Sequence, residues 1–158
     1  MNIKDFLIKA KTETYANVSV PKSESSRAGS SDYHYEEVIN GKKYVYHDTY
    51  FGGTKFAGEE VVYIDSDVPV WGMNYYGNTI DENLSEDVMD KALRPALMEV
   101  GKDDSVLPVR GPRNYKNEGY EYSFSVNGDL EDFEGVEEIK KDDIVIYRLK
   151  CHGGIIKK

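Results

Sequence analysis

The stretch FAGEEVV, from Phe56 to Val62, returns later in the chain as FEGVEEI, from Phe133 to Ile139. In both copies a phenylalanine, a glycine, a glutamate and a β-branched residue stand at every second position, which places them on one face of a strand. Flanking matches extend the likeness: Tyr44-x-Tyr46 with Gly52 returns as Tyr120-x-Tyr122 with Gly128, and Trp71 with Tyr76-Gly77 returns as Tyr147 with His152-Gly153. The sequence therefore indicates an internal repeat over approximately 44–77 and 120–154. Chance similarity between tyrosine-rich strands is the alternative.

Each copy has the pattern of three strands separated by short turns. In the first copy the alternating runs begin at Tyr44, Phe56 and Val70, and glycine or aspartate residues end them. Such short connections favour antiparallel pairing, because parallel strands need long crossovers. One meander alone buries only one face. We therefore predict an α+β fold in which two repeated three-stranded antiparallel meanders form one curved sheet.

Two helices are expected to cover the apolar side of that sheet. An N-terminal helix has four apolar residues at helical spacing: Ile3, Phe6, Leu7 and Ala10. A central helix begins at Ser85 and has an apolar face that extends to Val100, with Gly101 as its stop. Pro95 lies inside this run and removes a backbone donor, so it should kink the helix or divide it in two. Residues 107–119, which contain Pro108, Gly111, Pro112 and Gly119, are predicted to be an irregular connection.

The length of 158 residues fits a single domain over 1–158. The segment of approximately 19–32 is rich in serine and has no hydrophobic period, so we predict a mobile loop there. Exposed edges of the meanders leave room for a homodimer.

The formal charge of −9 argues against nucleic acid as a direct partner, because phosphate binding depends on clustered Lys and Arg. An acidic surface suits simple solubility, or a basic protein partner reached by electrostatic steering. No apolar stretch is long enough for a membrane span, and the amphipathic start does not resemble a signal peptide. Cys151 is the single cysteine, which fits a reducing cytoplasm.

Glu60 and Glu137 are the residues whose positions are hardest to explain as surface charge. Each shares a strand face with a phenylalanine and a β-branched residue, so its carboxylate must be paired, protonated or lining a cavity. If the repeat brings both to one site, they could act as an acid/base pair. Pairing of each glutamate with a nearby Arg or Lys is the alternative.

We expect a ligand-binding surface where the mid-strand glycines bend the sheet and aromatic residues lie nearby. Its candidate residues are Glu60, Trp71, Asn74, Tyr76, Arg110, Glu137 and His152. Arg110 could bind an anionic group, although pairing with Asp or Glu explains it equally. The aromatic residues could simply be core or cross-strand pairs. Cys151 and His152 are adjacent on a strand and point to opposite faces, so they do not form a nucleophile and base. The histidines lack metal-ligand spacing, and no cofactor fingerprint occurs.

Several strings resemble an uncharacterised bacterial family: YHDTYFGG at 46–53, FAGEE at 56–60, VWGMNYYG at 70–77, Arg110-Gly111-Pro112 and His152-Gly153-Gly154. Members of that family occur alone or behind a helix-turn-helix domain of the xenobiotic-response-element type. The resemblance implies a sensor or effector-binding role and carries over no catalytic residue. Here a Ser-rich loop follows the first helix in place of a second helix, so direct DNA binding is not expected.

Three classes of function therefore stand open. The leading hypothesis is a non-enzymatic domain that binds a small molecule as an effector. An acidic interaction module, such as an antitoxin or immunity-type inhibitor of a basic partner, is the second. A hydrolase-like enzyme that uses Glu60 and Glu137 is the third, and it requires the two carboxyl groups within about 5–10 Å of each other.

Overall fold

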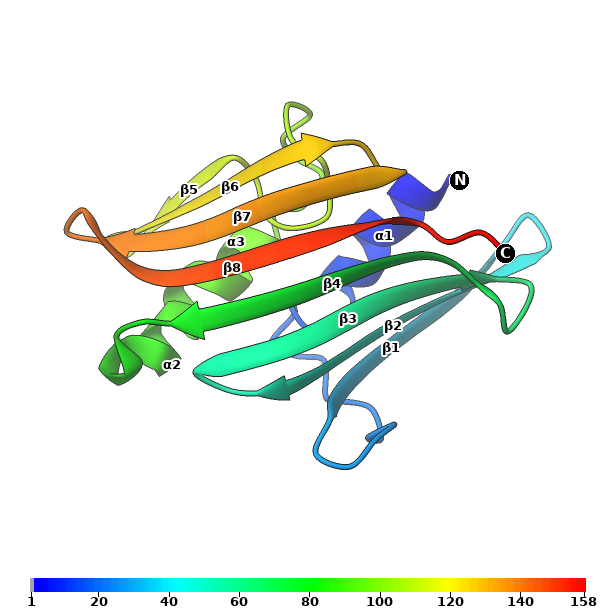
Figure 1. Cartoon of the computed structure of the whole chain (residues 1–158), viewed down its shortest axis with the longest axis horizontal. Helices are drawn as coiled ribbons and strands as arrows, with labels where there is room; N and C mark the ends of the chain where they lie inside the picture. Colours follow the sequence, from blue (N-terminus) through cyan, green and yellow to red (C-terminus); the bar gives the residue numbers. More distant parts are fainter. Residues whose placement is uncertain (1) are drawn as a thin grey trace.

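The computed structural model describes residues 2–158 and contains one antiparallel sheet of eight strands (Figure 1). In chain order the strands are β1 (Ser31–Ile39), β2 (Lys42–Gly52), β3 (Lys55–Ile64), β4 (Pro69–Thr79), β5 (Asn114–Asn117), β6 (Tyr120–Gly128), β7 (Asp132–Lys141) and β8 (Ile144–Ile155). Their order across the sheet is β1-β2-β3-β4-β8-β7-β6-β5, so β4 and β8 meet at its centre. The predicted α+β class with a single curved antiparallel sheet is confirmed.

Each half of the sheet contains four strands, where sequence analysis predicted three. The additional strands are the two edges, β1 and β5. β1 joins β2 through Asn40 and Gly41, whose φ angles of 52° and 76° are those of a two-residue hairpin turn. The Asn-Gly pair is a strong hairpin signal that the sequence analysis did not use.

The second edge strand corrects the prediction for residues 107–119. β5 occupies Asn114–Asn117 and turns into β6 through Glu118 and Gly119, with φ angles of 49° and 84°. The irregular connection therefore ends before β5. At four residues, β5 is too short to show a hydrophobic period in the sequence.

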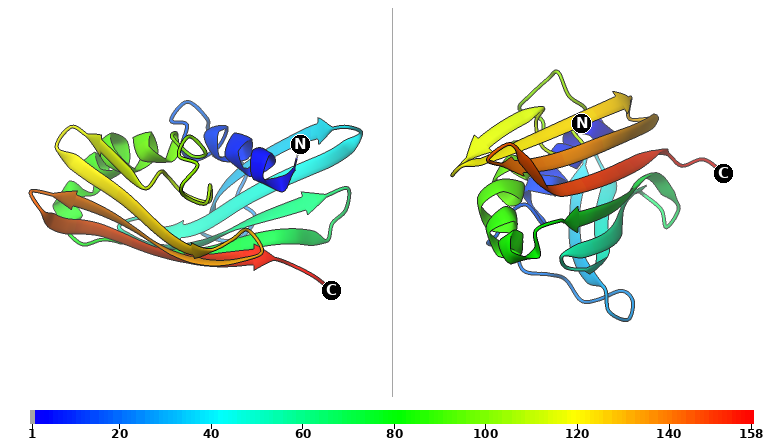
Figure 2. Two further views of the ribbon diagram at one scale, coloured as in Figure 1. Left: turned by 90° about the horizontal axis from the view of Figure 1, so that it is seen from above. Right: turned by 60° about the vertical axis from the view of Figure 1, so that its left-hand side comes forward.

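Both helical regions lie in the hollow of the curved sheet (Figure 2). The first is α1 (Ile3–Thr12), where the side chain of Asn2 accepts a hydrogen bond from the backbone N–H of Asp5 at 3.0 Å. This cap satisfies one of the donors that a helix start leaves free. Phe6, Leu7 and Ala10 are buried against the sheet. In residues 2–158 no helix has the length and apolar character that a bilayer crossing requires.

The second helical region is divided as Pro95 predicts. It consists of η1 (Glu82–Leu84), α2 (Ser85–Asp87), a π-helical segment η2 (Val88–Leu93) and α3 (Arg94–Leu97). Within it the N–H of Arg94 donates to the carbonyl of Met89, a spacing of five residues. The π-helical turn widens the helix immediately before Pro95, and such turns often occur at functional sites.

An outside donor satisfies the carbonyl that Pro95 leaves without a partner. In a regular helix the N–H of residue 95 would bond to the carbonyl of Lys91, and proline has no N–H. The side-chain amide of Asn117, from β5, donates to this carbonyl at 2.7 Å. The edge strand therefore holds the divided helix against the sheet.

The core fills the concave face, where Tyr46, Trp71, Tyr122 and Tyr147 are almost fully buried. Mid-strand glycines make room for the neighbouring rings. A Cβ atom on Gly77 would lie 2.1 Å from Cζ of Phe56, so only glycine allows that ring to lie over β4. This is the close approach that glycine inside a strand indicates.

The segment between α1 and β1 is tied to the sheet at its end. Ser31 and Asp32, predicted as loop, belong to β1, and Asp32 is fully buried. The Ser26 hydroxyl donates to Asp32 at 2.6 Å, Ser30 also donates, and Nε2 of His47 lies 2.6 Å away. Burial acts to raise the pKa of Asp32, but these hydrogen bonds outweigh it and hold the pKa below its usual range. Mobility of the remainder of 19–32 stays a prediction.

Candidate functional site

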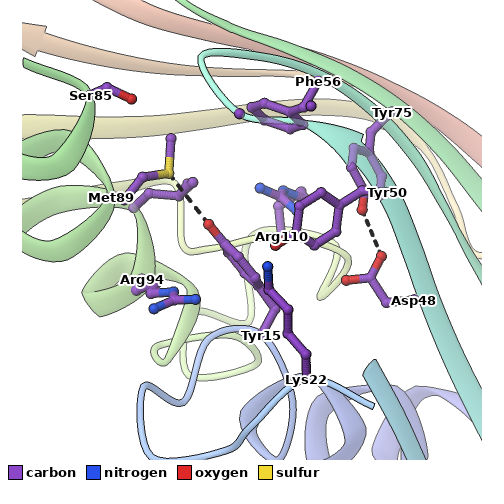
Figure 3. Close-up of a pocket in the computed structure, with 13 residues that line it drawn as sticks. Tyr15, Lys22, Asp48, Tyr50, Phe56, Tyr75, Ser85, Met89, Arg94 and Arg110 are labelled. Atoms are coloured by element: carbon purple, nitrogen blue, oxygen red, sulfur yellow. Dashed lines mark hydrogen bonds between the residues drawn. The ribbon is translucent and has the colours of Figure 1, made fainter. Parts of the chain in front are cut away.

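A cavity of about 350 Å³ lies between the first half of the sheet and the elements that cover it (Figure 3). Strands β2, β3 and β4 form its floor, and the divided helix forms one wall. The segment after α1 and the irregular chain before β5 close the other sides. Its lining residues are Tyr15, Lys22, Asp48, Tyr50, Gly52, Gly53, Phe56, Tyr75, Ser85, Met89, Leu93, Arg94 and Arg110.

Aromatic rings and a thioether make most of the inner surface. The rings of Tyr15 and Tyr50 meet edge to face with centroids 5.9 Å apart. The hydroxyl of Tyr15 points at Sδ of Met89, 3.4 Å away. Burial raises the pKa of Tyr15 to about 12, so this phenol stays neutral at physiological pH. The cavity therefore offers flat apolar walls, as small-molecule sites commonly do.

Asp48 is a buried carboxyl group on the floor of the cavity. Tyr75 donates a hydrogen bond to its Oδ1 at 2.6 Å (Figure 3). Burial, and then the negative charge of Glu60 opposite it on β3, raise the pKa of Asp48 to about 7. Its hydrogen bond from Tyr75 and the charges of Lys11 and Arg110 only partly offset this rise. A carboxyl group that titrates near neutrality inside a cavity marks a candidate functional residue.

Glu60 forms a buried ion pair with a residue of the first helix. Lys11 donates to its Oε2, and the side chains of both residues are almost completely buried. Because Glu60 and Asp48 are register partners on β3 and β2, the ion pair adjoins the cavity floor. Pairing with a nearby Lys was the alternative interpretation of Glu60, and the structure contains this pair.

Glu137 lies in a closed network in the other half of the sheet. Arg110 holds it with two hydrogen bonds, of 2.9 Å from Nε and 2.7 Å from Nη2. The hydroxyls of Tyr122 and Tyr147 donate to its two oxygens at 2.6 Å and 2.9 Å. Each carboxylate oxygen thus accepts two hydrogen bonds, and the residue is fully buried. Glu137 has no free lone pair with which to accept a substrate proton.

Two cations of the cavity wall differ from Arg110 because no carboxylate pairs with them in residues 2–158. The guanidinium carbon of Arg94 lies 4.5 Å from the centroid of the Tyr15 ring, and its Nε is buried without a hydrogen-bond partner. Nζ of Lys22 bonds the hydroxyl of Ser31 at 3.0 Å and lies 5.8 Å from the Tyr50 ring. The cavity therefore combines apolar walls with uncompensated positive charge.

The predicted site residues do not share this cavity. Only Arg110 lines it; Glu60 and Glu137 are buried in separate ion pairs. Trp71 is a core residue: its indole N–H donates to the carbonyl of Leu130 at 3.1 Å, and its ring stacks on that of Phe133. These four residues are all buried, but the structure does not bring them together in this cavity, because Glu60, Glu137 and Trp71 each pack against a partner of their own.

The remaining three predicted residues lie on the outer face of the sheet. Asn74 and His152 are cross-strand partners on β4 and β8, and Tyr76 follows on the same face with 56% exposure. They line an open groove with residues of β6 and β7. Their position separates them from the cavity by the thickness of the sheet. In residues 2–158 no three His, Cys, Asp or Glu side chains are placed to hold a metal ion.

Sequence reasoning missed Asp48, Arg94, Tyr15 and Lys22. A signal existed for Asp48, because it stands in alternation with Tyr44, Tyr46 and Tyr50 and therefore shares their inward face. That is the same argument that singled out Glu60. Tyr15 and Lys22 come from a segment without periodicity, so nothing in the sequence places them near a strand.

The chain matches the model of one protein family, a domain of unknown function (DUF5680), over residues 48–156. The match spans more than half of the sequence, and the protein belongs to this family. No curated protein and no solved structure matches the chain. The matched range includes Asp48, Arg94 and Arg110, whereas Tyr15 and Lys22 precede it. Much of the cavity is therefore built within the family domain, and the N-terminal segment completes it.

Proposed function

We propose that this protein is a non-enzymatic small-molecule-binding domain and that the cavity between the sheet and the helices is its site. The observation that carries this proposal is Arg94, a cation partly buried in an apolar cavity with its Nε unpaired. Burying a charged group without a partner is costly, so such an arrangement is expected where a ligand supplies the partner. The volume of about 350 Å³ is at the small end of the range for ligand pockets.

An effector role is the form of this function that we favour. The resemblance to proteins that carry a helix-turn-helix domain supports it, because such fusions couple ligand binding to another activity. A cytoplasmic location, proposed from the single buried cysteine, fits such a role. The hydrolase alternative is weaker, since the four hydrogen bonds to Glu137 leave no free partner for Glu60.

We further infer that β2–β4 and β6–β8 are the repeated unit seen in the sequence. Support comes from the strand order, in which β4 and β8 pair at the centre and each half continues outward in the same sequence. Across the two halves Glu60 faces Asp48, and Glu137 faces Phe124. In the second half the ring of Phe124 stands where the first half has the carboxyl group of Asp48. We therefore assign the polar cavity to the first half of the sheet alone.

A thermal-shift screen with metabolites, sugars, nucleotides and divalent metals tests the proposal. A ligand at a hundred times its Kd should stabilise the protein by about 2.7 kcal/mol, or roughly 5–10 °C at this size. Met89→Trp should fill the cavity and abolish the shift. Met89→Leu conserves the volume and should retain it.

Two results would contradict the proposal. Hits that stabilise Met89→Trp as strongly as the parent protein would place binding elsewhere. A screen without hits would favour the second candidate, an acidic module that binds a basic protein, for which the net charge of −9 is the supporting observation. A pull-down whose yield falls with rising salt would then test that candidate.

A further inference from the structure

We propose that the ligand of this cavity is a small aromatic acid whose carboxylate binds Arg94 and Lys22 while a polar group at its far end reaches Asp48. This inference rests on the proposed function and adds the chemical class of the ligand. It is drawn from the charged groups that line the cavity, with Arg94 and Asp48 on opposite sides of it, and from its aromatic rings (Figure 3).

Arg94 gives the anion a directional partner. Its guanidinium carbon lies 4.5 Å from the centroid of the Tyr15 ring, its buried Nε has no hydrogen-bond partner, and no carboxylate of residues 2–158 forms an ion pair with it. A planar guanidinium presents paired N–H donors that match the two oxygens of a carboxylate. A bound carboxylate would supply the partner that Nε lacks.

Lys22 adds a second positive charge from a different element. Its ammonium group bonds one neutral hydroxyl, that of Ser31, so it keeps donors for a ligand. The protein has 29 acidic and 20 basic residues, so carboxylate partners are abundant. Two cations without carboxylate partners at one cavity in such an acidic chain indicate selection for an external anion.

The aromatic walls of the cavity favour a ligand with an aromatic ring. Tyr15 and Tyr50 stand edge to face, and Phe56 makes a similar contact with Tyr75 at 6.1 Å between centroids. In Figure 3 the Tyr15 and Tyr50 rings lie between Arg94 and Asp48, with Phe56 above them. A flat ring can stack on or edge against such neighbours, which contributes beyond the burial of its area.

Asp48 requires that the ligand carry a polar group at the end away from its carboxylate. Tyr75 donates to its Oδ1, and this is the one hydrogen bond to the Asp48 carboxyl group from residues 2–158. Because burial and Glu60 raise the pKa of Asp48 to about 7, the carboxyl group can accept or donate at physiological pH. A hydroxyl on the ligand satisfies both states, since it can donate and accept.

The test compares three probes of nearly equal shape by calorimetry: 4-hydroxyphenylacetate, its neutral amide 4-hydroxyphenylacetamide, and phenylacetate. The acid should bind at least about tenfold more tightly than the amide, which is the usual scale of a hydrogen-bonded charge. Loss of the hydroxyl should weaken binding several-fold. The methyl resonance of Met89, labelled with carbon-13, should shift on binding and place the probe in the cavity.

Variants distinguish loss of the contact to the ligand carboxylate from a general effect of mutation on the fold. Arg94→Gln should remove most of the preference for the acid over the amide, and Lys22→Gln should reduce it as a second variant on an exposed segment. Arg148→Gln, an exposed arginine paired with Glu138, should leave the preference unchanged.

An amide that binds as tightly as the acid, or a preference that survives both Arg94→Gln and Lys22→Gln, overturns this inference while the cavity remains a binding site. If no probe and no member of a wider ligand panel shifts Met89, the proposed function itself fails, and the inference fails with it.

Discussion

Tyr75 donates a hydrogen bond to Asp48 at 2.6 Å, and its ring reaches that position across the bare backbone of Gly58. A Cβ atom on Gly58 would lie 2.4 Å from the Tyr75 hydroxyl and 2.7 Å from the carbonyl oxygen of Thr49. A glycine on β3 thus permits a tyrosine on β4 to hold a carboxyl group on β2. Three adjacent strands fix the polar end of the cavity.

Gly58→Ala should therefore destabilise the protein and disturb the cavity. Overpacking against a backbone carbonyl and a buried ring costs about 1–3 kcal/mol. Gly53→Ala is the matched control, because nothing lies within 4 Å of a Cβ at that position. Urea unfolding of the two variants measures the difference. Equal unfolding free energies would show that Tyr75 can move without cost, against the arrangement described.

The raised pKa of Asp48 predicts a specific dependence of stability on pH. Its pKa rises from 3.8 to about 7 in the fold, so between these values the folded protein keeps a proton that the unfolded chain has released. Stability should fall as pH rises through this range, because the folded state binds more protons there. Four groups face Asp48 and act on its pKa: Glu60 raises it, whereas Tyr75, Lys11 and Arg110 lower it.

Asp48→Asn isolates this contribution, since the amide keeps an oxygen for Tyr75 and cannot ionise. Relative to the parent protein, the variant should gain stability between pH 5 and pH 8, by at most about 3 kcal/mol, because the two states differ in bound protons over about two pH units of this range. Chemical denaturation at both pH values gives the four unfolding free energies. A difference between variant and parent that is the same at pH 5 and pH 8 would mean that Asp48 titrates normally.

Sequence periodicity predicted the direction in which the critical side chains point, but not their neighbours. The period of two correctly implied that Glu60 and Glu137 face inward and need partners. Those partners, Lys11 and Arg110, come from a helix and an irregular segment, whose position depends on tertiary packing. For the aromatic candidates the period itself carried the answer: Trp71 and Tyr76 are five residues apart on β4 and therefore point to opposite faces, Trp71 to the core and Tyr76 outward.

Breaking the network around Glu137 should be among the most destabilising changes in the protein. Arg110→Met leaves a fully buried carboxylate with only the hydroxyls of Tyr122 and Tyr147, a change that typically costs about 3–5 kcal/mol. Arg148→Met breaks an exposed pair with Glu138 and should cost less than about 1 kcal/mol. The double variant Arg110→Met/Glu137→Leu should recover much of the loss. Equal costs for Arg110→Met and Arg148→Met would contradict the buried network.

The contact between Asn117 and the divided helix gives the last prediction, which a double-mutant cycle can test. Asn117→Ala removes the donor to the Lys91 carbonyl and should cost about 1–3 kcal/mol, because that carbonyl is left without a partner. Asn114→Ala, an exposed change on the same strand, is the control.

In a Pro95→Ala background the new N–H of residue 95 can bond to the Lys91 carbonyl within the helix. Asn117→Ala should then cost at least about 1 kcal/mol less than it does in the parent protein. The π-helical turn that positions Met89 and Arg94 should relax at the same time, so affinity for the aromatic acid probe should fall although stability is regained. Additive effects of Asn117→Ala and Pro95→Ala on the unfolding free energy would show that the two residues do not serve the same carbonyl.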